Sequence, residues 1–402
     1  MGNKLDKPIT NKTSFDGENE MLKYGMSEMQ SFKNSMELFT LKNTNLLEQN
    51  KKISLFGIFD GHNGSEISKY LSLHFSQFLS ENKKFINGDY KQALKETFIN
   101  IDNSLRALEV QKEISKYSTK NSLNFSELNL NLKEEENKNI SNFLELFNPR
   151  NLEGANIAEF CGSCGIIVLV TEKNVYIANS GNSKCIPINI KNEIMKDKIN
   201  KEHIITDQNE INRLKLAYGF VEEENDNIFD NNETNEKIKF KPINYCPLII
   251  TRGFGDLIYK DIKLIKQEDQ YISVNPDIIE VPIDELGYMI IGNNEVFNET
   301  IDNNKDNNYN IVKFFFEKNK NNKKISEIIE EFFDENITKK EKNKQVENMI
   351  NNIGCIIIEF KHDNNTINVD ENNENRSAKE SENKINDKNN KNEDEVEEEE
   401  NQ

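Results

Sequence analysis

The chain has 402 residues and a formal net charge of −19, with 35% hydrophobic and 30% charged residues. This composition is too polar for the whole chain to pack into cores, so a good fraction is expected in loops or disorder. No basic face stands out, which disfavours a nucleic-acid partner, and no apolar run reaches the length of a transmembrane segment.

Both ends of the chain have the composition of segments outside a folded core. Residues 1–21 predict a disordered leader. Residues 362–402 contain 14 acidic and 5 basic residues and predict an acidic low-complexity tail. The domain between them, residues 22–361, carries three polar insertions, at about 109–155, 223–240 and 301–323.

The composition favours an intracellular protein, in the cytoplasm or the nucleus. The first residues lack the apolar core of a secretory signal, and five scattered cysteines argue for reduced thiols rather than a disulfide framework. Gly2 permits N-myristoylation and thus a membrane contact, although Asp6 stands where that motif requires Ser or Thr.

Strands and helices alternate along the predicted domain. Apolar runs that end in polar turns predict strands, and apolar residues spaced three and four apart predict helices. The predicted strands lie within 51–60, 161–170, 174–184, 248–256, 287–295 and 351–360, with a hairpin across Thr171–Asn174. The predicted helices are 67–79, 90–108, 210–218, 311–316 and 325–333.

The stretch Phe56–Gly64 combines a buried strand with a turn that contains Asp60, Gly61 and His62. A carboxylate at the mouth of a strand is a natural ligand for a hard metal ion, and a nearby histidine can hold or deliver a proton. Alone, this turn is weak evidence, because such residues are common in ordinary turns.

Five further segments give this turn a context. The chain resembles the protein phosphatase 2C family of metal-dependent serine/threonine phosphatases over about residues 22–361. The matching segments, in chain order, are Tyr24–Gln30, Phe56–Gly64, Gly162–Cys164 with Ile177–Lys184, Thr251–Asp256, Tyr288–Asn298 and Asn351–Ile358. The resemblance implies an α+β fold, a four-layer α/β/β/α sandwich of two antiparallel sheets flanked by helix pairs.

The resemblance also implies a chemistry. Family members hold two divalent ions, Mn²⁺ or Mg²⁺, in a cage of carboxylates and one backbone carbonyl, and a metal-activated water attacks the phosphorus atom. Three ligands of that cage are matched in this chain, by Glu37, Asp60 and the Gly61 carbonyl. His62 matches the candidate proton donor, and Lys33 stands where the family uses an arginine to hold phosphate.

Four other positions depart from the family pattern. Leu38, Asn294 and Asn351 replace aspartates, and Asn182 replaces the aspartate of a Gly-Asp-Ser turn. Asparagine can still offer a carbonyl oxygen, but the charge that attracts a dication is lost. A weakly bound Mn²⁺ or Mg²⁺, as a single ion next to Glu37 and Asp60, is therefore expected.

Four side chains near these segments allow two interpretations each. His62 is either the proton donor of the family pattern or a retained hydrogen-bonding residue, and neither is favoured. Glu295, beside Asn294, is either an unconstrained polar residue, which is favoured, or a displaced metal ligand. Cys161 and Cys164 are either inert core thiols, which is favoured, or a redox or zinc pair.

Two functions follow from the resemblance. The depleted cage favours a pseudophosphatase, a folded phosphatase 2C domain that acts by binding a protein or phosphoprotein partner. The alternative is an active, divergent Mn²⁺- or Mg²⁺-dependent phosphatase that hydrolyses phosphoserine and phosphothreonine.

Overall fold

The computed structural model describes residues 5–47, 52–118, 156–218, 222–223, 238–239, 249–260, 265–297, 310–320, 323–342 and 351–362. Contacts divide the chain into two units, Met1–Phe360 and Lys361–Gln402, and both large sheets belong to the first unit. Most of the predicted insertions 109–155 and 223–240, and the tail beyond residue 362, lie outside the described residues.

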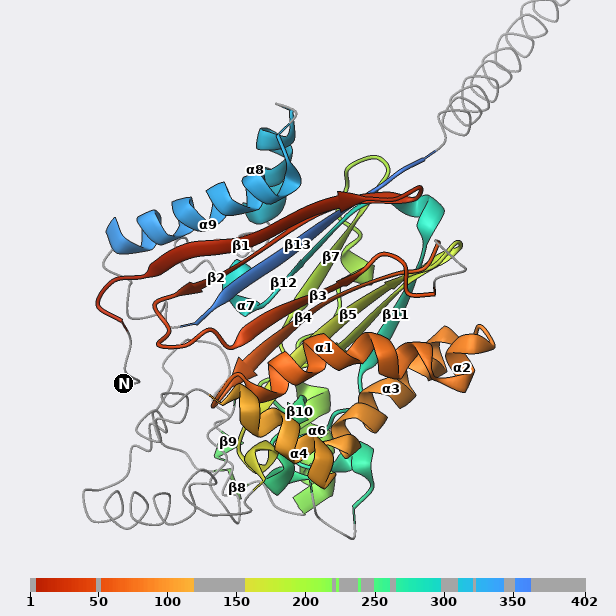
Figure 1. Ribbon diagram of the computed structural model, residues 1–402, viewed down its shortest axis with the longest axis vertical. Coiled ribbons are helices and arrows are strands. Elements are labelled where there is room, and N and C mark those ends of the chain that lie inside the picture. Colours follow the sequence, from red (N-terminus) through yellow and green to blue (C-terminus); the bar gives the residue numbers. More distant parts are fainter. Residues whose placement is uncertain are drawn as a thin grey trace, which may run out of the picture. The chain divides into compact units, whose positions relative to one another are not determined.

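The first sheet has five antiparallel strands, drawn in the upper part of Figure 1. Their order across the sheet is β1 (Ile9–Glu18), β2 (Leu22–Ser31), β13 (Ile353–Phe360), β12 (Leu286–Gly292) and β7 (Lys184–Asn189). The last predicted strand, β13, therefore lies in the middle of the sheet and joins the two ends of the domain.

The second sheet is also antiparallel. Its order is β11 (Asp277–Pro282), β6 (Asn174–Ser180), β5 (Gly162–Val170), β4 (Ser54–His62) and β3 (Leu38–Asn43), and the short β10 (Phe254–Gly255) pairs with β5. The strands β5 and β6 form the hairpin predicted across Thr171–Asn174. Every residue of β5 is buried, because this central strand is covered on both faces, which explains its continuous apolar sequence.

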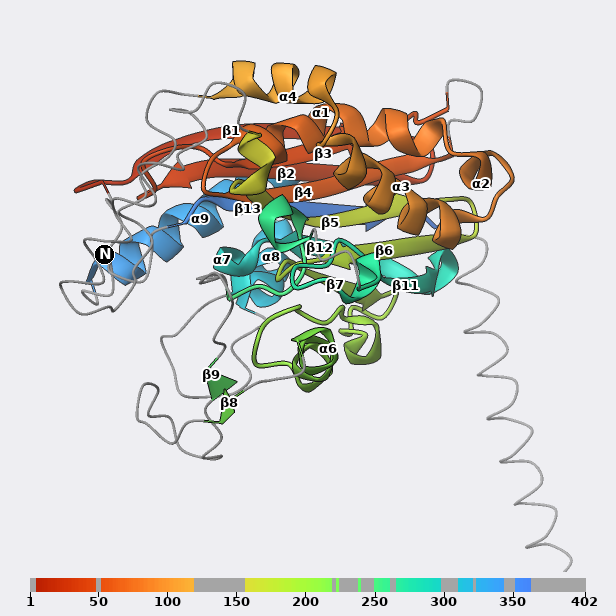
Figure 2. The same cartoon turned by 90° about the horizontal axis from the view of Figure 1, so that it is seen from below.

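Helices cover the outer face of each sheet (Figures 1 and 2). The helices α1 (Glu66–Ser80) and α3 (Tyr90–Ser104) pack on the second sheet, and α8 (Asn310–Asn319) and α9 (Ile325–Lys342) pack on the first. The predicted four-layer α/β/β/α sandwich is confirmed. No helix within the described ranges is long and apolar enough to cross a membrane.

Short helices and strands complete the described part of the chain. The remaining α-helices are α2 (Lys83–Ile86), α4 (Leu108–Ile114), α6 (Gln208–Tyr218) and α7 (Asn294–Phe297), and the remaining strands are β8 (Glu222–Glu223) and β9 (Ile238–Lys239). Single 3₁₀ turns span Ser115–Tyr117, Ile157–Glu159, Lys196–Lys198, Leu257–Tyr259, Gln267–Asp269 and Ile283–Glu285.

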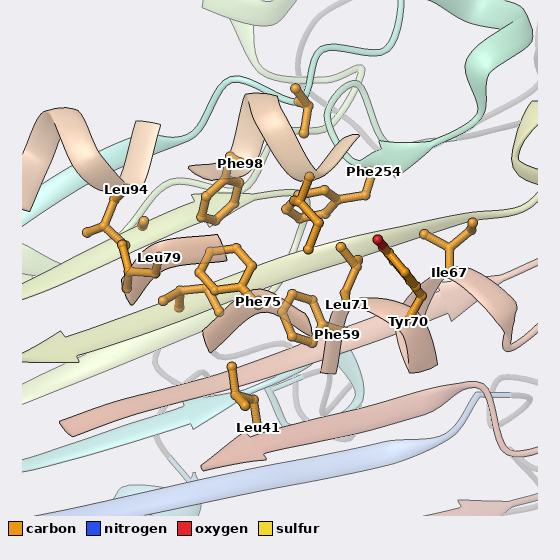
Figure 3. Close-up of a cluster of buried hydrophobic side chains, with 14 of the residues drawn as sticks. Leu41, Phe59, Ile67, Tyr70, Leu71, Phe75, Leu79, Leu94, Phe98 and Phe254 are labelled. Carbon is orange, nitrogen blue, oxygen red and sulfur yellow. The ribbon is translucent and has the colours of Figure 1, made fainter. Parts of the chain in front are cut away.

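Aromatic rings form the centre of the layer between α1, α3 and the second sheet (Figure 3). Phe75 of α1 lies 5.8 Å from Phe59 of β4 and 5.3 Å from Phe98 of α3, between ring centroids, and Phe98 lies 5.0 Å from Phe254. Burial of each such side chain stabilises the fold by roughly 1.5–3 kcal/mol. This layer fixes β4, the strand that carries Asp60.

The layer between the two sheets determines where Asp60 lies. Phe56 and Ile58 of β4 pack in the inter-sheet core, and Asp60 shares their face of the strand because side chains alternate with a period of two. Asp60 therefore stands at the end of an otherwise apolar layer, where the chain passes from core to turn.

The prediction of a disordered leader over residues 1–21 is wrong for part of that range. Ile9–Glu18 forms the edge strand β1, which pairs with β2. Most of its residues are exposed, including Phe15, whose ring centroid lies 3.4 Å from the Lys42 ammonium nitrogen. Because an edge strand is held by backbone hydrogen bonds and buries little, its composition resembles that of a polar loop.

Three other boundaries differ from the prediction. In the predicted strand 248–256 the described residues form only isolated bridges and the two-residue β10, because the chain passes along the sheet edge there. The helix α4 extends into the predicted insertion 109–155. The helix α8 confirms the predicted helix 311–316, but it lies inside the predicted insertion 301–323 and belongs to the helix layer, with Ile311 and Phe315 in the core.

A buried carboxylate ties α6 to the second sheet. Glu210 accepts hydrogen bonds from Arg213, Arg252 and Thr251, at distances of 2.6–3.1 Å. Burial by itself raises the pKa of Glu210, but Arg252, Arg213 and Thr251 together lower it from 4.5 to about 2. The folded state therefore holds this carboxylate in its charged form.

Replacement of this carboxylate should make the fold less stable in a pH-dependent way. Because the folded-state pKa is depressed, the stabilisation is present above pH 4.5 and is lost as the pH falls toward about 2. We expect Glu210→Gln to lower the free energy of unfolding by about 3 kcal/mol at neutral pH, and the difference from wild type to shrink below about pH 4.

Urea unfolding at several pH values measures this difference. Glu172→Gln is the matched control, because Glu172 is 53% exposed and lies 3.9 Å from Lys52, an arrangement that contributes about 0–1 kcal/mol. A difference for Glu210→Gln that stays constant down to about pH 2 would contradict the expectation.

Candidate functional site

The candidate site lies where four segments meet at one end of the inter-sheet layer. The loop after β2 carries Lys33 and Glu37, the end of β4 carries Asp60 and Gly61, and the end of β12 and the start of β13 complete the site with Asn293 and Asn352, respectively. The structure thus brings together Lys33, Glu37, Asp60 and Gly61, residues that lie up to 28 positions apart in the sequence.

Glu37 is held from both its side chain and its main chain. Its carboxylate accepts a hydrogen bond from Ser35 Oγ at 2.6 Å. Its carbonyl oxygen accepts from the Gly61 amide at 3.0 Å and from Ser68 Oγ at 2.5 Å. With 6% of its side chain exposed, Glu37 is a buried carboxylate bound to the turn that contains Asp60 and Gly61.

The Lys33 side chain points into this cluster. Its ammonium nitrogen lies 2.8 Å from Glu37 Oε2 and donates a hydrogen bond to the Gly61 carbonyl at 3.2 Å. The side chain is 14% exposed. The two oxygens that Lys33 contacts are two of the three predicted metal ligands.

Asp60 receives an amide donor from the opposite sheet. Asn293 Nδ2 donates to Asp60 Oδ2 at 3.0 Å. Burial raises the pKa of Asp60, and this effect outweighs the opposing effects of the Lys33 charge and the Asn293 hydrogen bond. The raised pKa shows that the charged form of Asp60 is only partly compensated by its neighbours.

A second buried asparagine fixes the loop that carries Lys33 and Glu37. Asn352 accepts a hydrogen bond from the Glu37 amide at 2.8 Å and donates to the carbonyls of Gln30 at 2.9 Å and Ser35 at 3.0 Å. Asn293 in turn donates to the Asn352 carbonyl at 2.9 Å. These bonds connect the β2 loop to the first sheet.

Leu38 lies in the apolar core. It is opposite Asp60 in the pairing of β3 with β4, and none of its surface is exposed. Its side chain packs on Gly354 of β13, where an added Cβ would lie 2.5 Å from Leu38 Cδ2. The residue that replaces an aspartate of the family pattern thus fills space between the sheets.

The two asparagines at predicted metal positions do not share one environment. Asn351 donates to Glu295 Oε1 at 2.9 Å, and Asn294 is partly buried in the first turn of α7. Glu295 is 5% exposed, so the favoured expectation of an unconstrained polar residue is wrong. Glu295 is fixed next to Asn351 because α7 turns it inward.

Asn182 lies in the turn between β6 and β7, on the far side of β5. Its side-chain oxygen is 3.3 Å from Cys164 Sγ, and Cys164 is opposite Asp60 in the pairing of β4 with β5. Burial raises the pKa of Cys164 to about 12 and that of Cys161 well above its usual value. Both are free, buried thiols, as predicted.

His62 forms a pair with a buried carboxylate. Its Nε2 lies 2.7 Å from Asp256 Oδ2, and Gly162 leaves room for this pair, because a Cβ there would lie 2.5 Å from His62 Nε2. Burial lowers the pKa of His62, but Asp256 more than reverses this effect, so the pKa is raised. The neighbouring carboxylate stabilises the imidazolium, which is the form a proton donor requires.

The donor set can be tested for its fit to divalent ions. Within the described ranges, no group of three or more His, Cys, Asp and Glu side chains is placed to hold a metal ion. The Lys33 ammonium lies against Glu37 and the Gly61 carbonyl, and the Asn293 amide lies against Asp60. Mg²⁺ requires oxygens at about 2.1 Å in octahedral geometry, so the observed arrangement does not fit an ion at this position.

Three residues of the site are not identified by the sequence patterns. The patterns point to Asn294 and Asn351 rather than to their neighbours Asn293 and Asn352, and they do not assign Asp256 to His62. One signal is available for Asn293, which is an amide at a position where the family segment has an apolar cysteine. The other pairings depend on contacts between segments more than 190 residues apart.

Comparison with known proteins agrees with this fold. A profile described as protein phosphatase 2C matches residues 22–120 and 108–345. Probable protein phosphatase 2C 6 of Paramecium tetraurelia is 26% identical over 363 residues, which cover 90% of this chain and 100% of the relative. Probable protein phosphatase 2C 21 of Arabidopsis thaliana is 24% identical over 352 residues, covering 83% and 86%.

A solved structure shows the same fold. The crystal structure of serine-threonine phosphatase 2C from Toxoplasma gondii superposes with a TM-score of 0.57 at 14% identity, covering 87% of this chain and 99% of the other. Fold and site together define an α+β sandwich of the phosphatase 2C type. With the family profile matching most of its length, the chain belongs to the protein phosphatase 2C family, whose members act on phosphoproteins and generally depend on Mn²⁺ or Mg²⁺.

The hydrogen bonds of Asn352 predict a clear effect on stability. Asn352→Ala removes three bonds and leaves the Glu37 amide and the carbonyls of Gln30 and Ser35 without this partner. We expect the free energy of unfolding to fall by about 2–4 kcal/mol, measured by urea denaturation. The control is Asn212→Ala, at an exposed position of α6, which should change stability by less than about 0.5 kcal/mol. Equal effects of the two variants would contradict the role of Asn352.

Proposed function

We propose that this domain is a pseudophosphatase, a phosphatase 2C fold with impaired catalysis that acts by binding a protein partner. One observation carries the proposal. The chain supplies its own partners to the carboxylates of the cage: the Lys33 ammonium is paired with Glu37 at 2.8 Å, and the Asn293 amide donates a hydrogen bond to Asp60. Family chemistry requires those same oxygens to hold divalent ions.

The loss of charge supports the same conclusion. Leu38, Asn294 and Asn351 take the places of three anions in the family pattern. At an effective dielectric constant near 20, each anion within 4 Å of a charge contributes about 4 kcal/mol of attraction, or twice that for a dication. A carbonyl oxygen of asparagine restores a ligand atom but not this attraction.

A divalent ion at Glu37 and Asp60 would have to displace the Lys33 ammonium. We therefore propose that any Mn²⁺ or Mg²⁺ binds weakly there, as a single ion. The role of Lys33 as a phosphate contact is weakened for the same reason, because its ammonium is engaged with Glu37 and Gly61.

The alternative is an active, divergent phosphatase. The pair of His62 with Asp256 favours it, because the imidazolium could still protonate a leaving group. A proton donor without an activated nucleophile accounts for only part of the family's catalysis, since general acid catalysis contributes about 10²–10⁴-fold.

Turnover of the full chain tests the proposal. With Mn²⁺ and either an aryl phosphate or a phosphothreonine peptide, we expect kcat/KM to be at least about 1000-fold below that of a family member with all its carboxylates, assayed in parallel. Asp60→Asn serves as the matched variant. Robust metal-dependent turnover that Asp60→Asn abolishes would overturn the proposal and establish the alternative.

The charge of the site bears on how a partner is recognised. The cluster of Lys33 and His62 with Glu37, Asp60 and Asp256 is net negative whether or not His62 is protonated. A phosphate dianion gains little there, so we propose that the partner, including a phosphoprotein partner, is recognised mainly by other surfaces of the domain.

Paired peptides test this point. We expect the full chain to bind phosphoserine peptides and their unphosphorylated forms with dissociation constants within about threefold of each other, measured by fluorescence polarisation. A large preference for the phosphorylated peptides that is lost in Lys33→Met would instead place phosphate at the site.

We propose that the protein acts inside the cell, in the cytoplasm or nucleus. The free, buried thiols Cys161, Cys164, Cys185 and Cys355 support a reducing compartment. N-myristoylation of Gly2 stays a prediction, since residues 1–4 lie outside the described part of the chain.

A further inference from the structure

The position of the Lys33 ammonium is the feature that the family pattern does not explain. It lies between Glu37 Oε2, at 2.8 Å, and the Gly61 carbonyl, at 3.2 Å, and its charge acts on Asp60 as well. These three residues are the ones that the sequence assigns to a metal ion. A positive charge of the chain itself thus stands where an external cation would be held.

The electrostatics of the site require such a charge. Glu37 is buried and Asp60 is partly buried at the end of an apolar layer, and carboxylates removed from water are costly unless they are paired with a positive charge or hydrogen-bonded. Asn293 and Ser35 provide neutral donors, one to each carboxylate. Lys33 provides the positive charge, at distances typical of an ammonium donor.

The local structure holds Lys33 in this place. Gln30 Nε2 donates to the Lys33 carbonyl at 2.8 Å, and Asn352 binds the carbonyls of Gln30 and Ser35 on either side. The loop follows Ser31, the last residue of β2, whose φ of 61° lies in the left-handed region. The ammonium is therefore delivered by a fixed loop and is not a long side chain that reached a nearby carboxylate by chance.

We propose that the Lys33 ammonium is a tethered cation that replaces the divalent ion at Glu37, Asp60 and the Gly61 carbonyl, and closes this end of the sandwich without metal. This inference deepens the proposed function, on which it rests for the assignment of these oxygens as a former metal cage. A single positive charge on the chain neutralises the carboxylates and cannot be removed by a chelator. It also offers no bound water for reaction.

The proposal predicts a latent metal site beneath Lys33. The variant Lys33→Met removes the ammonium from Glu37, Asp60 and the Gly61 carbonyl. The remaining carboxylate and carbonyl oxygens are ligands suited to Mn²⁺. By contrast, Lys33→Arg keeps a positive charge near Glu37. The two variants therefore separate the effect of charge from that of any change at position 33.

Isothermal titration calorimetry of the full chain with MnCl₂ tests the proposal. We expect Lys33→Met to bind Mn²⁺ at least about 10-fold more tightly than wild type, and the double variant Lys33→Met/Asp60→Asn to lose the gain. Lys33→Arg should bind as weakly as wild type. Circular dichroism of each variant confirms that it is folded.

Lys12 provides a matched control outside the site. Its ammonium makes the same kind of contacts, 2.7 Å from Asp334 Oδ1 and 3.2 Å from the Thr10 carbonyl, and its side chain is 11% exposed. Lys12→Met should leave the affinity for Mn²⁺ unchanged. If Lys12→Met and Lys33→Met gained the same affinity for Mn²⁺, any freed carboxylate would bind the ion, and the proposal would be overturned.

A measurement on wild type keeps the proposal testable if Lys33→Met does not fold. The melting temperature of wild type should be the same, within about 1 °C, in EDTA and in millimolar Mn²⁺, because the tethered cation already stabilises the cage. A rise of several degrees in Mn²⁺, or wild-type affinity equal to that of Lys33→Met, would overturn it. The phosphatase assay of the wild type tests the proposed function separately, because Mn²⁺ binding to Lys33→Met is measured without any substrate.

Discussion

The burial of two carboxylates at the end of an apolar layer is the constraint on which this site depends. Glu37 is buried and Asp60 is partly buried there, so an uncompensated negative charge would cost several kcal/mol. The polar contacts at this end of the sandwich compensate the negative charge. Lys33 supplies charge, and Ser35 and Asn293 supply neutral donors.

The same contacts connect parts of the chain that are far apart in sequence. Asn352 joins the β2 loop to the start of β13, and Asn293 joins β12 to Asp60 on the opposite sheet. In a fold whose two sheets are otherwise joined by apolar packing, these amides determine how the sheets meet at the site. Leu38 packs on Gly354 and lies opposite Asp60, so the apolar core extends as far as this site residue.

The chain therefore keeps the phosphatase 2C architecture while its site has a different charge balance. The aromatic layer under β4 and the pairing of β4 with β5 hold Asp60, Gly61 and His62 at the end of β4. We propose that the source of positive charge has changed, with the Lys33 ammonium beside Glu37 and the Gly61 carbonyl in place of a divalent ion. His62 and Asp256 form a pair near this site, and their contact requires no metal ion because both side chains are positioned by the fold.

The sequence by itself determined the family, the order of most strands and helices, and the presence of Asp60 and His62 in the Phe56–Gly64 turn, because apolar periodicity and short motifs are local properties. It did not determine the edge strand Ile9–Glu18, whose backbone pairing leaves little trace in composition. Nor did it show that Lys33 binds Glu37 and Gly61, or that Asn293 and Asn352 rather than Asn294 and Asn351 reach Asp60 and Glu37. Only the tertiary structure decided these partners, because side chains of adjacent residues point in different directions and their contacts form between distant segments.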